Sequence, residues 1–273
     1  YTTLFRSKNI RIYLLIDEYD NFTNTILSTY GTEFYRKATH GEGFIRGFFN
    51  VIKSATTGTG AALERLFITG VSPVTMDDVT SGFNIGTNIT NDSWFNDLVG
   101  FSENELREML EYYKEQGVLQ ESIDEIVAMM KPNYDNYCFS EDTLEQCMFN
   151  SDMALYFLKS FVLHHKKPKE IVDPNIRTDF NKLAYLIKLD HGLGENFSVI
   201  KEIAEQGEII TDIVTHFSAL EMTDPSNFKS LLFYFGLLSI KGVDMVGRPI
   251  LHVPNLVVRE QLFNFLIQGD RKS

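Results

Sequence analysis

Two neighbouring acids, Asp17 and Glu18, are the residues of this sequence best placed to do chemistry. They directly follow the apolar run 10–16 (Ile-Arg-Ile-Tyr-Leu-Leu-Ile). A carboxylate at the end of a strand, beside a bound triphosphate, can hold Mg²⁺ through a coordinated water. A second carboxylate next to it can orient or deprotonate the attacking water. Acids also occur at ordinary solvated strand ends, so the pair by itself leaves both interpretations open.

The elements around these acids predict a βαβ unit. The run 10–16 has the composition of a strand buried on both faces, as in a parallel sheet. Residues 34–54 carry apolar side chains at helical spacing, and residues 65–71 read as a second buried strand. This order implies parallel pairing with a right-handed crossover. The acids then lie at the carboxyl end of the strand, where ligands bind in open α/β sheets.

An acidic strand end of this kind is typical of the Walker B element of a P-loop nucleotide hydrolase. Such an enzyme also needs the loop G-x-x-x-x-G-K-S/T, whose backbone N–H groups and Lys hold the phosphates. The sequence contains no such motif, because residues 57–60 (Thr-Gly-Thr-Gly) lack the Lys and residues 41–43 (Gly-Glu-Gly) carry an acid. Either the protein is not a nucleotide enzyme, or the loop lies upstream of Tyr1 and the chain is a fragment.

Composition excludes several classes of protein. A net charge of −12, from 25 Lys+Arg and 37 Asp+Glu, argues against general electrostatic binding of nucleic acid, but it does not exclude a local basic patch. A hydrophobic content of 44% excludes wholesale disorder. Cys138 and Cys147 are too few for a disulfide scaffold or a four-ligand zinc site, and they predict reduced thiols in a cytoplasmic protein. No apolar run reaches about 18 residues, so no membrane helix is expected.

The remainder of the chain predicts helices and a hairpin. Ser102 and Glu105 have capping-box spacing at the start of a helix, and Pro132 is expected to stop the helix that begins at Ile123. The charged, proline-containing stretch 166–174 is the best candidate for a domain boundary. The other expected elements are helices over 152–164, 178–189, 197–206 and 255–267, a strand over 208–215, a helix capped by Asp224, and a hairpin of 238–241 with 250–253. Helices followed by a hairpin are typical of a winged-helix arrangement.

Motifs spread along the chain resemble a bacterial family known as AAA-ATPase-like, in particular its Bacteroidetes-type members. Members often carry a C-terminal PD-(D/E)xK nuclease-type domain. The resemblance covers about residues 8–268, in an order and spacing that make it fairly specific. The motifs lie at residues 15–20 (Leu-Ile-Asp-Glu-Tyr-Asp), 48–53, 67–72, 81–84, 100–106, 134–139, 172–179 and 231–238. Within residues 134–139 the chain departs from the family pattern, because Asn136 replaces the usual Gly and Cys138 stands where Arg is common.

The resemblance implies an α/β fold of two domains. Residues 1–165 would be the C-terminal part of a P-loop NTPase core, a partial parallel sheet without Walker A, together with a helical lid. Residues 166–273 would be a mainly helical domain with a winged-helix-like end. The nuclease-type domain is expected beyond the last helix, so we expect no nuclease activity from these residues.

The resemblance also implies roles for individual residues. Asp17 would hold Mg²⁺ through a water, Glu18 and Thr69 would be catalytic, and Asp20 and Asn84 would contribute to ATP binding. Thr69 would contact the γ-phosphate or the lytic water as a sensor. The plainer alternatives are a strand threonine for Thr69 and structural turns for Asp20 and Asn84. Arg107, on a later helix, would be either a lid arginine or a solvated helix charge.

Two functions follow as hypotheses. In the first, the intact parent binds and hydrolyses ATP with Mg²⁺, and this chain alone is inactive and binds ATP poorly. In the second, the chain is a non-catalytic interaction module that binds a partner protein, another copy of itself or nucleic acid. Both hypotheses place the protein in the cytoplasm, away from membranes.

Overall fold

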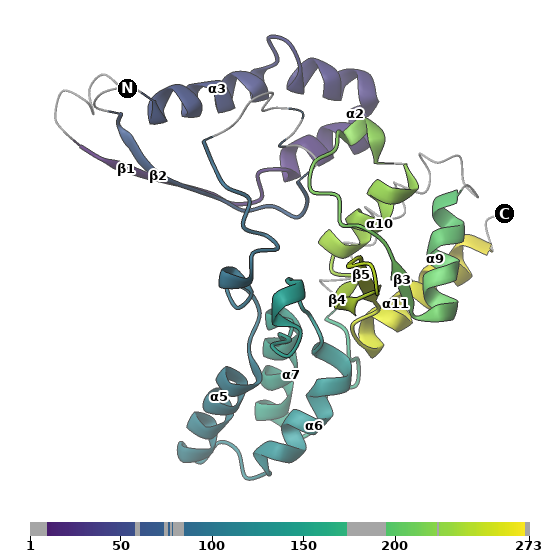
Figure 1. Ribbon diagram of the computed structural model, residues 1–273. Helices are drawn as coiled ribbons and strands as arrows, with labels where there is room; N and C mark the ends of the chain where they lie inside the picture. The colour runs from purple at the N-terminus through teal and green to yellow at the C-terminus, as the bar shows by residue number, and fades with distance from the viewer. Residues whose placement is uncertain are drawn as a thin grey trace. The chain divides into compact units, whose positions relative to one another are not determined.

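The computed structural model describes residues 10–57, 61–73, 76, 78, 85–173, 195–222 and 224–270 (Figure 1). Contacts divide the chain into two units, both of mixed α/β structure. The first unit comprises residues 1–88 and 214–227, and the second comprises residues 89–213 and 228–273. The domain boundary predicted at residue 166 lies inside the second unit.

The first unit contains the predicted parallel strand pair. β1 (Ile12–Ile16) pairs in parallel with β2 (Leu63–Ile68), and the two run side by side in Figure 1. The connection between them consists of two helices, α2 (Asn21–Thr39) and α3 (Phe44–Thr56), where one helix over 34–54 was expected. The helices are separated at Gly43, where a Cβ atom would lie 2.2 Å from a backbone oxygen of α2. The sequence pattern missed this tight turn because apolar residues keep helical spacing on both sides of it.

The strand pair is covered on one face only within the described residues. Alternate residues of β1 are half-buried and pack against the buried core of α2 and α3. On the opposite face Tyr13 is 67% exposed, Leu15 76% and Phe67 41%. The prediction that β1 is buried on both faces is therefore wrong for this part of the chain. A continuous apolar run shows that a strand can be buried on both sides, but it does not supply the second covering layer.

A later segment of the chain joins the first unit through one buried acid. Asp78 accepts hydrogen bonds from the Tyr35 hydroxyl at 2.6 Å, the Ser218 hydroxyl at 2.7 Å and the backbone N–H of Ala219 at 2.9 Å. Because the carboxylate lies between α2 and residues 214–227, it holds that segment against the helix.

The second unit begins with three packed helices, α5 (Glu103–Glu115), α6 (Ile123–Tyr134) and α7 (Ser151–His164). The predicted capping box of Ser102 and Glu105 is confirmed. The prediction that Pro132 stops α6 is wrong, since the helix continues to Tyr134. A proline this close to the helix end removes one backbone hydrogen bond without interrupting the turns that pack in the core. Short 3₁₀ turns are found at η1 (Ser93–Phe95) and η2 (Glu141–Thr143).

The second unit ends in a small antiparallel sheet. Its strand order is β3 (Glu208–Ile210), β5 (Pro249–His252), β4 (Ser239–Val243), and β4 and β5 form the predicted hairpin. The helices around it in sequence are α9 (Glu195–Gln206), α10 (Pro225–Tyr234) and α11 (Leu256–Asp270). The helix predicted over 178–189 lies outside the described residues, and the winged-helix arrangement stays a prediction. None of the helices within the described ranges combines the length and apolarity needed to cross a bilayer.

Candidate functional site

The carboxyl ends of β1 and β2 bring Asp17 and Thr69 into contact. The Thr69 hydroxyl donates to Asp17 Oδ1 at 2.5 Å, although the two residues are 52 positions apart. Backbone hydrogen bonds continue past the strand ends, from Thr69 N–H to the Ile16 carbonyl at 2.8 Å and from Tyr19 N–H to the Thr69 carbonyl at 3.0 Å. The site therefore follows from the parallel register, which places the residues after both strands at one edge.

Glu18 has a strained backbone next to this contact. Its φ of 50° lies in the left-handed region, which costs a non-glycine residue about 1–3 kcal/mol. The Glu18 N–H donates to Asp17 Oδ1 at 3.0 Å, and the Asn21 side-chain amide donates to Glu18 Oε2 at 2.7 Å. Asp17 and Glu18 are both exposed. The turn thus presents two carboxylates to solvent, each held by a hydrogen bond.

Asp20 is buried, in contrast to its two acidic neighbours. Its carboxylate accepts from the backbone N–H groups of Val71 and Ser72 at 3.1 and 3.2 Å, from the Ser72 hydroxyl at 3.4 Å and from the Asn24 amide at 3.0 Å. The residue is 1% exposed. These bonds connect the turn after β1, the chain after β2 and the first turn of α2.

Gly70 allows the two turns to approach each other closely. A Cβ atom at this position would lie 2.3 Å from the Tyr19 ring and 2.7 Å from Asp20 Oδ1. The Tyr19 hydroxyl donates to the Ser72 carbonyl. No role for Tyr19, Gly70 or Ser72 was predicted from the sequence. The available signal was the glycine directly after a strand, which often marks a close approach of backbones.

The oxygen donors at the site suit a magnesium ion that keeps most of its waters. Asp17 Oδ1 is occupied by Thr69 and Glu18, whereas Oδ2 accepts no hydrogen bond within the described residues. Carboxylate and hydroxyl oxygens are hard ligands, and Mg²⁺ commonly takes one or two carboxylates together with substrate phosphates. No group of three or more His, Cys, Asp or Glu that could enclose a metal occurs in the described parts of the chain. The residues therefore fit an ion that is bound through its water ligands, and not an ion that is coordinated mainly by protein side chains.

Two other residues considered from the sequence are Asn84 and Arg107. Asn84 lies outside the described residues, as does the motif 81–84. Arg107 forms ion pairs on the surface of the second unit, at 2.9 Å with Glu103 and at 2.7 Å with Asp124. Hydrogen bonds to Asp124 and Glu103 raise the pKa of the guanidinium further. These contacts agree with the solvated helix charge.

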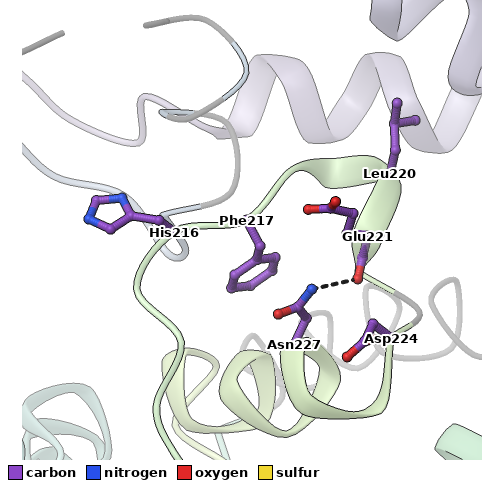
Figure 2. Close-up of a pocket in the computed structure, with 6 residues that line it drawn as sticks. All are labelled: His216, Phe217, Leu220, Glu221, Asp224 and Asn227. Carbon is purple, nitrogen blue, oxygen red and sulfur yellow. Dashed lines mark hydrogen bonds between the residues drawn. The ribbon is translucent and has the colours of Figure 1, made fainter. Parts of the chain in front are cut away.

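An open pocket in the first unit lies elsewhere (Figure 2). It is formed around the 3₁₀ turn η4 (Ala219–Glu221) and the start of α10. The Asn227 amide donates to the Glu221 carbonyl at 3.0 Å, and the Phe217 ring points into the space between the two elements. The lining residues are His216, Phe217, Leu220, Glu221, Asp224 and Asn227. None of these is a residue of the Asp17–Thr69 site, so the pocket is separate from the predicted chemistry.

Comparison with known proteins gives a match at the start of the chain. Residues 1–80 match the model of a family described as "Predicted AAA-ATPase". The matched segment includes Asp17, Glu18 and Thr69, and it ends before the second unit begins. No curated protein and no solved structure matches the chain significantly. The similarity to an AAA-ATPase-like family is therefore shown for these first 80 residues.

Proposed function

We propose that this chain is part of an AAA-ATPase-like protein that binds and hydrolyses ATP with Mg²⁺, and that Asp17, Glu18 and Thr69 form its hydrolytic site. The observation that carries the proposal is the Thr69–Asp17 hydrogen bond between the ends of two parallel strands. It lies within the residues that match the AAA-ATPase-like family. The two exposed carboxylates beside it supply the metal-holding and water-activating groups that the reaction needs.

Each residue has a separate task in this proposal. Asp17 Oδ2 would hold a water of the magnesium ion, while the Thr69 hydroxyl, which donates to Asp17 Oδ1, would contact the γ-phosphate. Glu18 would orient the lytic water and accept its proton, with its carboxylate held by Asn21. When bound, Mg²⁺ neutralises charge on the phosphate oxygens. Asp20 would position the turns without touching the nucleotide, because its carboxylate is already occupied. Asn84 stays a predicted nucleotide contact.

The phosphate cradle would come from a segment upstream of Tyr1. The chain has no Gly-rich loop with Lys, and it leaves an apolar sheet face with Tyr13 and Leu15 exposed. Such a face is what a parallel sheet shows when its remaining strands and helices are absent. We therefore propose that the residues upstream complete both the sheet and the site. This chain alone would then bind ATP poorly and be inactive.

The test uses the intact polypeptide that includes the upstream residues. Glu18→Gln should lower kcat for ATP hydrolysis by about 100-fold or more, the usual contribution of general base catalysis. ATP binding, measured by titration calorimetry, should be retained because the amide keeps the shape of the side chain. Glu42→Gln is the matched control, since Glu42 is an exposed acid of the same unit away from the site. A Glu18→Gln protein that hydrolyses ATP at the wild-type rate would contradict the proposal.

The alternative is a non-catalytic interaction module. The exposed apolar face around Tyr13, Leu15 and Phe67 favours it, because large exposed apolar patches mark protein–protein contacts. An upstream sequence with a degraded phosphate loop, and no ATP binding by the intact polypeptide, would support this function. Its nucleic-acid version conflicts with the net charge of −12 and is tested by a gel shift at low and moderate salt.

A further inference from the structure

The two cysteines of the second unit face each other across a short antiparallel pairing. Tyr137 and Met148 exchange both backbone hydrogen bonds, at 3.1 and 2.8 Å. Cys138 and Cys147 are the next positions on the two strands. Residues next to a hydrogen-bonded pair form a non-hydrogen-bonded pair with Cα atoms about 4.5 Å apart. That spacing falls within the range of about 4.4–6.8 Å over which disulfides form.

A buried amide fixes the two strands on the other side of the cysteines. Asn96 Oδ1 accepts from the Phe139 N–H at 3.2 Å, and its Nδ2 donates to the Gln146 carbonyl at 2.9 Å. Asn96 is 2% exposed. The cysteine pair is thus enclosed between a backbone pairing and a side-chain bridge, which together prevent the strands from separating.

The two thiols differ in exposure and acidity. Cys138 is buried, whereas Cys147 is partly exposed and opens the pair to solvent. The Cys138 thiol donates to the Ser140 carbonyl at 3.1 Å, and the Cys147 thiol donates to the Leu144 carbonyl at 3.5 Å. Hydrogen bonding between the two sulfurs lowers the pKa of Cys138 to about 7 and raises the pKa of Cys147. Because the thiolate is the reactive form, Cys138 is the better nucleophile at neutral pH.

We propose that Cys138 and Cys147 are a reversible dithiol–disulfide site that is oxidised by a small hydroperoxide. The Cys138 thiolate attacks one peroxide oxygen, so that an S–O bond forms, the O–O bond breaks and hydroxide leaves. The Cys147 sulfur then attacks the sulfenic sulfur of Cys138. The S–S bond forms, the S–O bond breaks, and the leaving hydroxide takes the Cys147 proton as water. The two thiols lose two electrons, which reduce the peroxide to water.

The reverse reaction also follows from the geometry. A small thiol reaches the exposed sulfur of Cys147 first, and it forms a mixed disulfide there. Cys138 leaves as the thiolate, and a low-pKa thiol is the better leaving group. A second molecule of the small thiol then releases Cys147. The site therefore closes with a peroxide and opens with an ordinary reducing agent.

The disulfide would stabilise the contact of this loop with β4. The Cys138 N–H donates to the Ser239 hydroxyl at 2.8 Å, and the Ile240 N–H donates to the Cys138 carbonyl at 3.3 Å. The ring closed by the new bond contains η2. Oxidation would therefore fasten residues 138–147 where they support the antiparallel sheet. All of these residues lie in the second unit, and the proposal does not rest on the proposed ATP hydrolysis.

The experiment treats the full chain with hydrogen peroxide, alkylates the remaining thiols and measures the intact mass. The expected product has lost the mass of two hydrogen atoms, takes up no alkylating reagent and regains both thiols with dithiothreitol. Peptide mapping should find Cys138 joined to Cys147. The Tm of the oxidised chain should be about 5 °C higher than that of the reduced chain, because the disulfide restricts the conformations of the unfolded chain.

The Cys147→Ser variant should stop at a sulfenic acid on Cys138, which dimedone traps. The Cys138→Ser variant should show neither the sulfenic acid nor the rise in Tm. The proposal is overturned if both wild-type thiols stay alkylatable after peroxide treatment. It is equally overturned if the cysteines pair only between molecules, or oxidise directly to sulfinic acid. The wild-type peptide map decides these outcomes even if a variant folds poorly.

Discussion

At Gly70 the chain after β2 passes so close to Tyr19 and Asp20 that no side chain fits. Gly70→Ala should therefore destabilise the protein by about 2 kcal/mol, the usual cost of overpacking a tight site. Urea denaturation followed by circular dichroism measures the change. Gly47→Ala is the matched control, because a Cβ atom on that residue of α3 meets nothing within 4 Å. The control should raise stability by about 0.5–1 kcal/mol, as alanine does in a helix interior.

Equal effects of the two glycine substitutions would contradict the close approach of the turns. The comparison is informative because both glycines belong to the first unit.

The three acids of the site differ in their exposure to solvent. Asp17 and Glu18 are exposed, while the Asp20 carboxylate is buried and accepts hydrogen bonds from four donors. Sequence spacing cannot distinguish these environments, because the acids are adjacent in one motif.

Among the elements, α5 shows how a helix start depends on pH. The Ser102 backbone N–H and hydroxyl donate to the Glu105 carboxylate at 2.9 and 2.8 Å, and both lower the pKa of that acid from 4.5. Because the folded pKa is depressed, this contribution to stability is complete above the unfolded pKa and is lost as the pH falls through the folded value. Ser102→Ala should cost about 1 kcal/mol at pH 7, typical of an N-cap.

The same substitution should cost less at pH 3, where more of Glu105 is protonated in the wild-type chain than at pH 7. Denaturant midpoints of the two proteins at both pH values measure the difference. A second acid at the start of this helix, Glu103, also has a lowered pKa because Lys131 and Arg107 donate to it, but it is present in both proteins. A cost of Ser102→Ala that is unchanged between the two pH values would show that the bond from the Ser102 hydroxyl to the Glu105 carboxylate contributes nothing to stability.

The segment 214–227 gives a second prediction for an element. Its attachment to α2 depends on Asp78, which accepts the Ala219 N–H. Asp78→Asn places an amide donor against the three donors that surround the carboxylate. The Ala219 amide should then exchange its hydrogen about tenfold faster, as expected for the loss of one hydrogen bond. Hydrogen exchange with mass spectrometry measures this rate. In Asp92→Asn, which alters the cap of η1 in the second unit, the exchange of Ala219 should stay at the wild-type rate.

For the whole molecule, the open face of the parallel pair predicts self-association. Leu15→Thr removes a 76% exposed apolar side chain and keeps a residue that favours strands. The variant should associate less than the wild type at equal concentration, as measured by light scattering after size exclusion. Trp94→Thr is the control, since Trp94 is a large apolar side chain of the second unit that is 89% exposed. If both substitutions reduce association alike, the strand face has no special role.

Local patterns predicted much of the fold, whereas contacts that no local pattern signals could not be predicted. The parallel pairing of β1 with β2, the Ser102 capping box and the β4–β5 hairpin follow from spacing within short segments. The contact of Thr69 with Asp17 was within reach because parallel strands end at one edge. The attachment of Ser218 to Asp78, 140 positions earlier, has no local signal. The exposure of one face of β1 could not be predicted from the sequence either. An apolar run shows that a strand can be buried on both faces, but it does not show whether a second layer covers it.

The bonds of Asp20 have a mechanical consequence. The carboxylate holds the chain immediately after Thr69 on one side and Asn24, in the first turn of α2, on the other. If the proposed ATP hydrolysis displaced Thr69, the displacement would therefore be transmitted to the helix. Through its bonds, Asp20 would couple a displacement of Thr69 at the ends of the strands to a movement of α2.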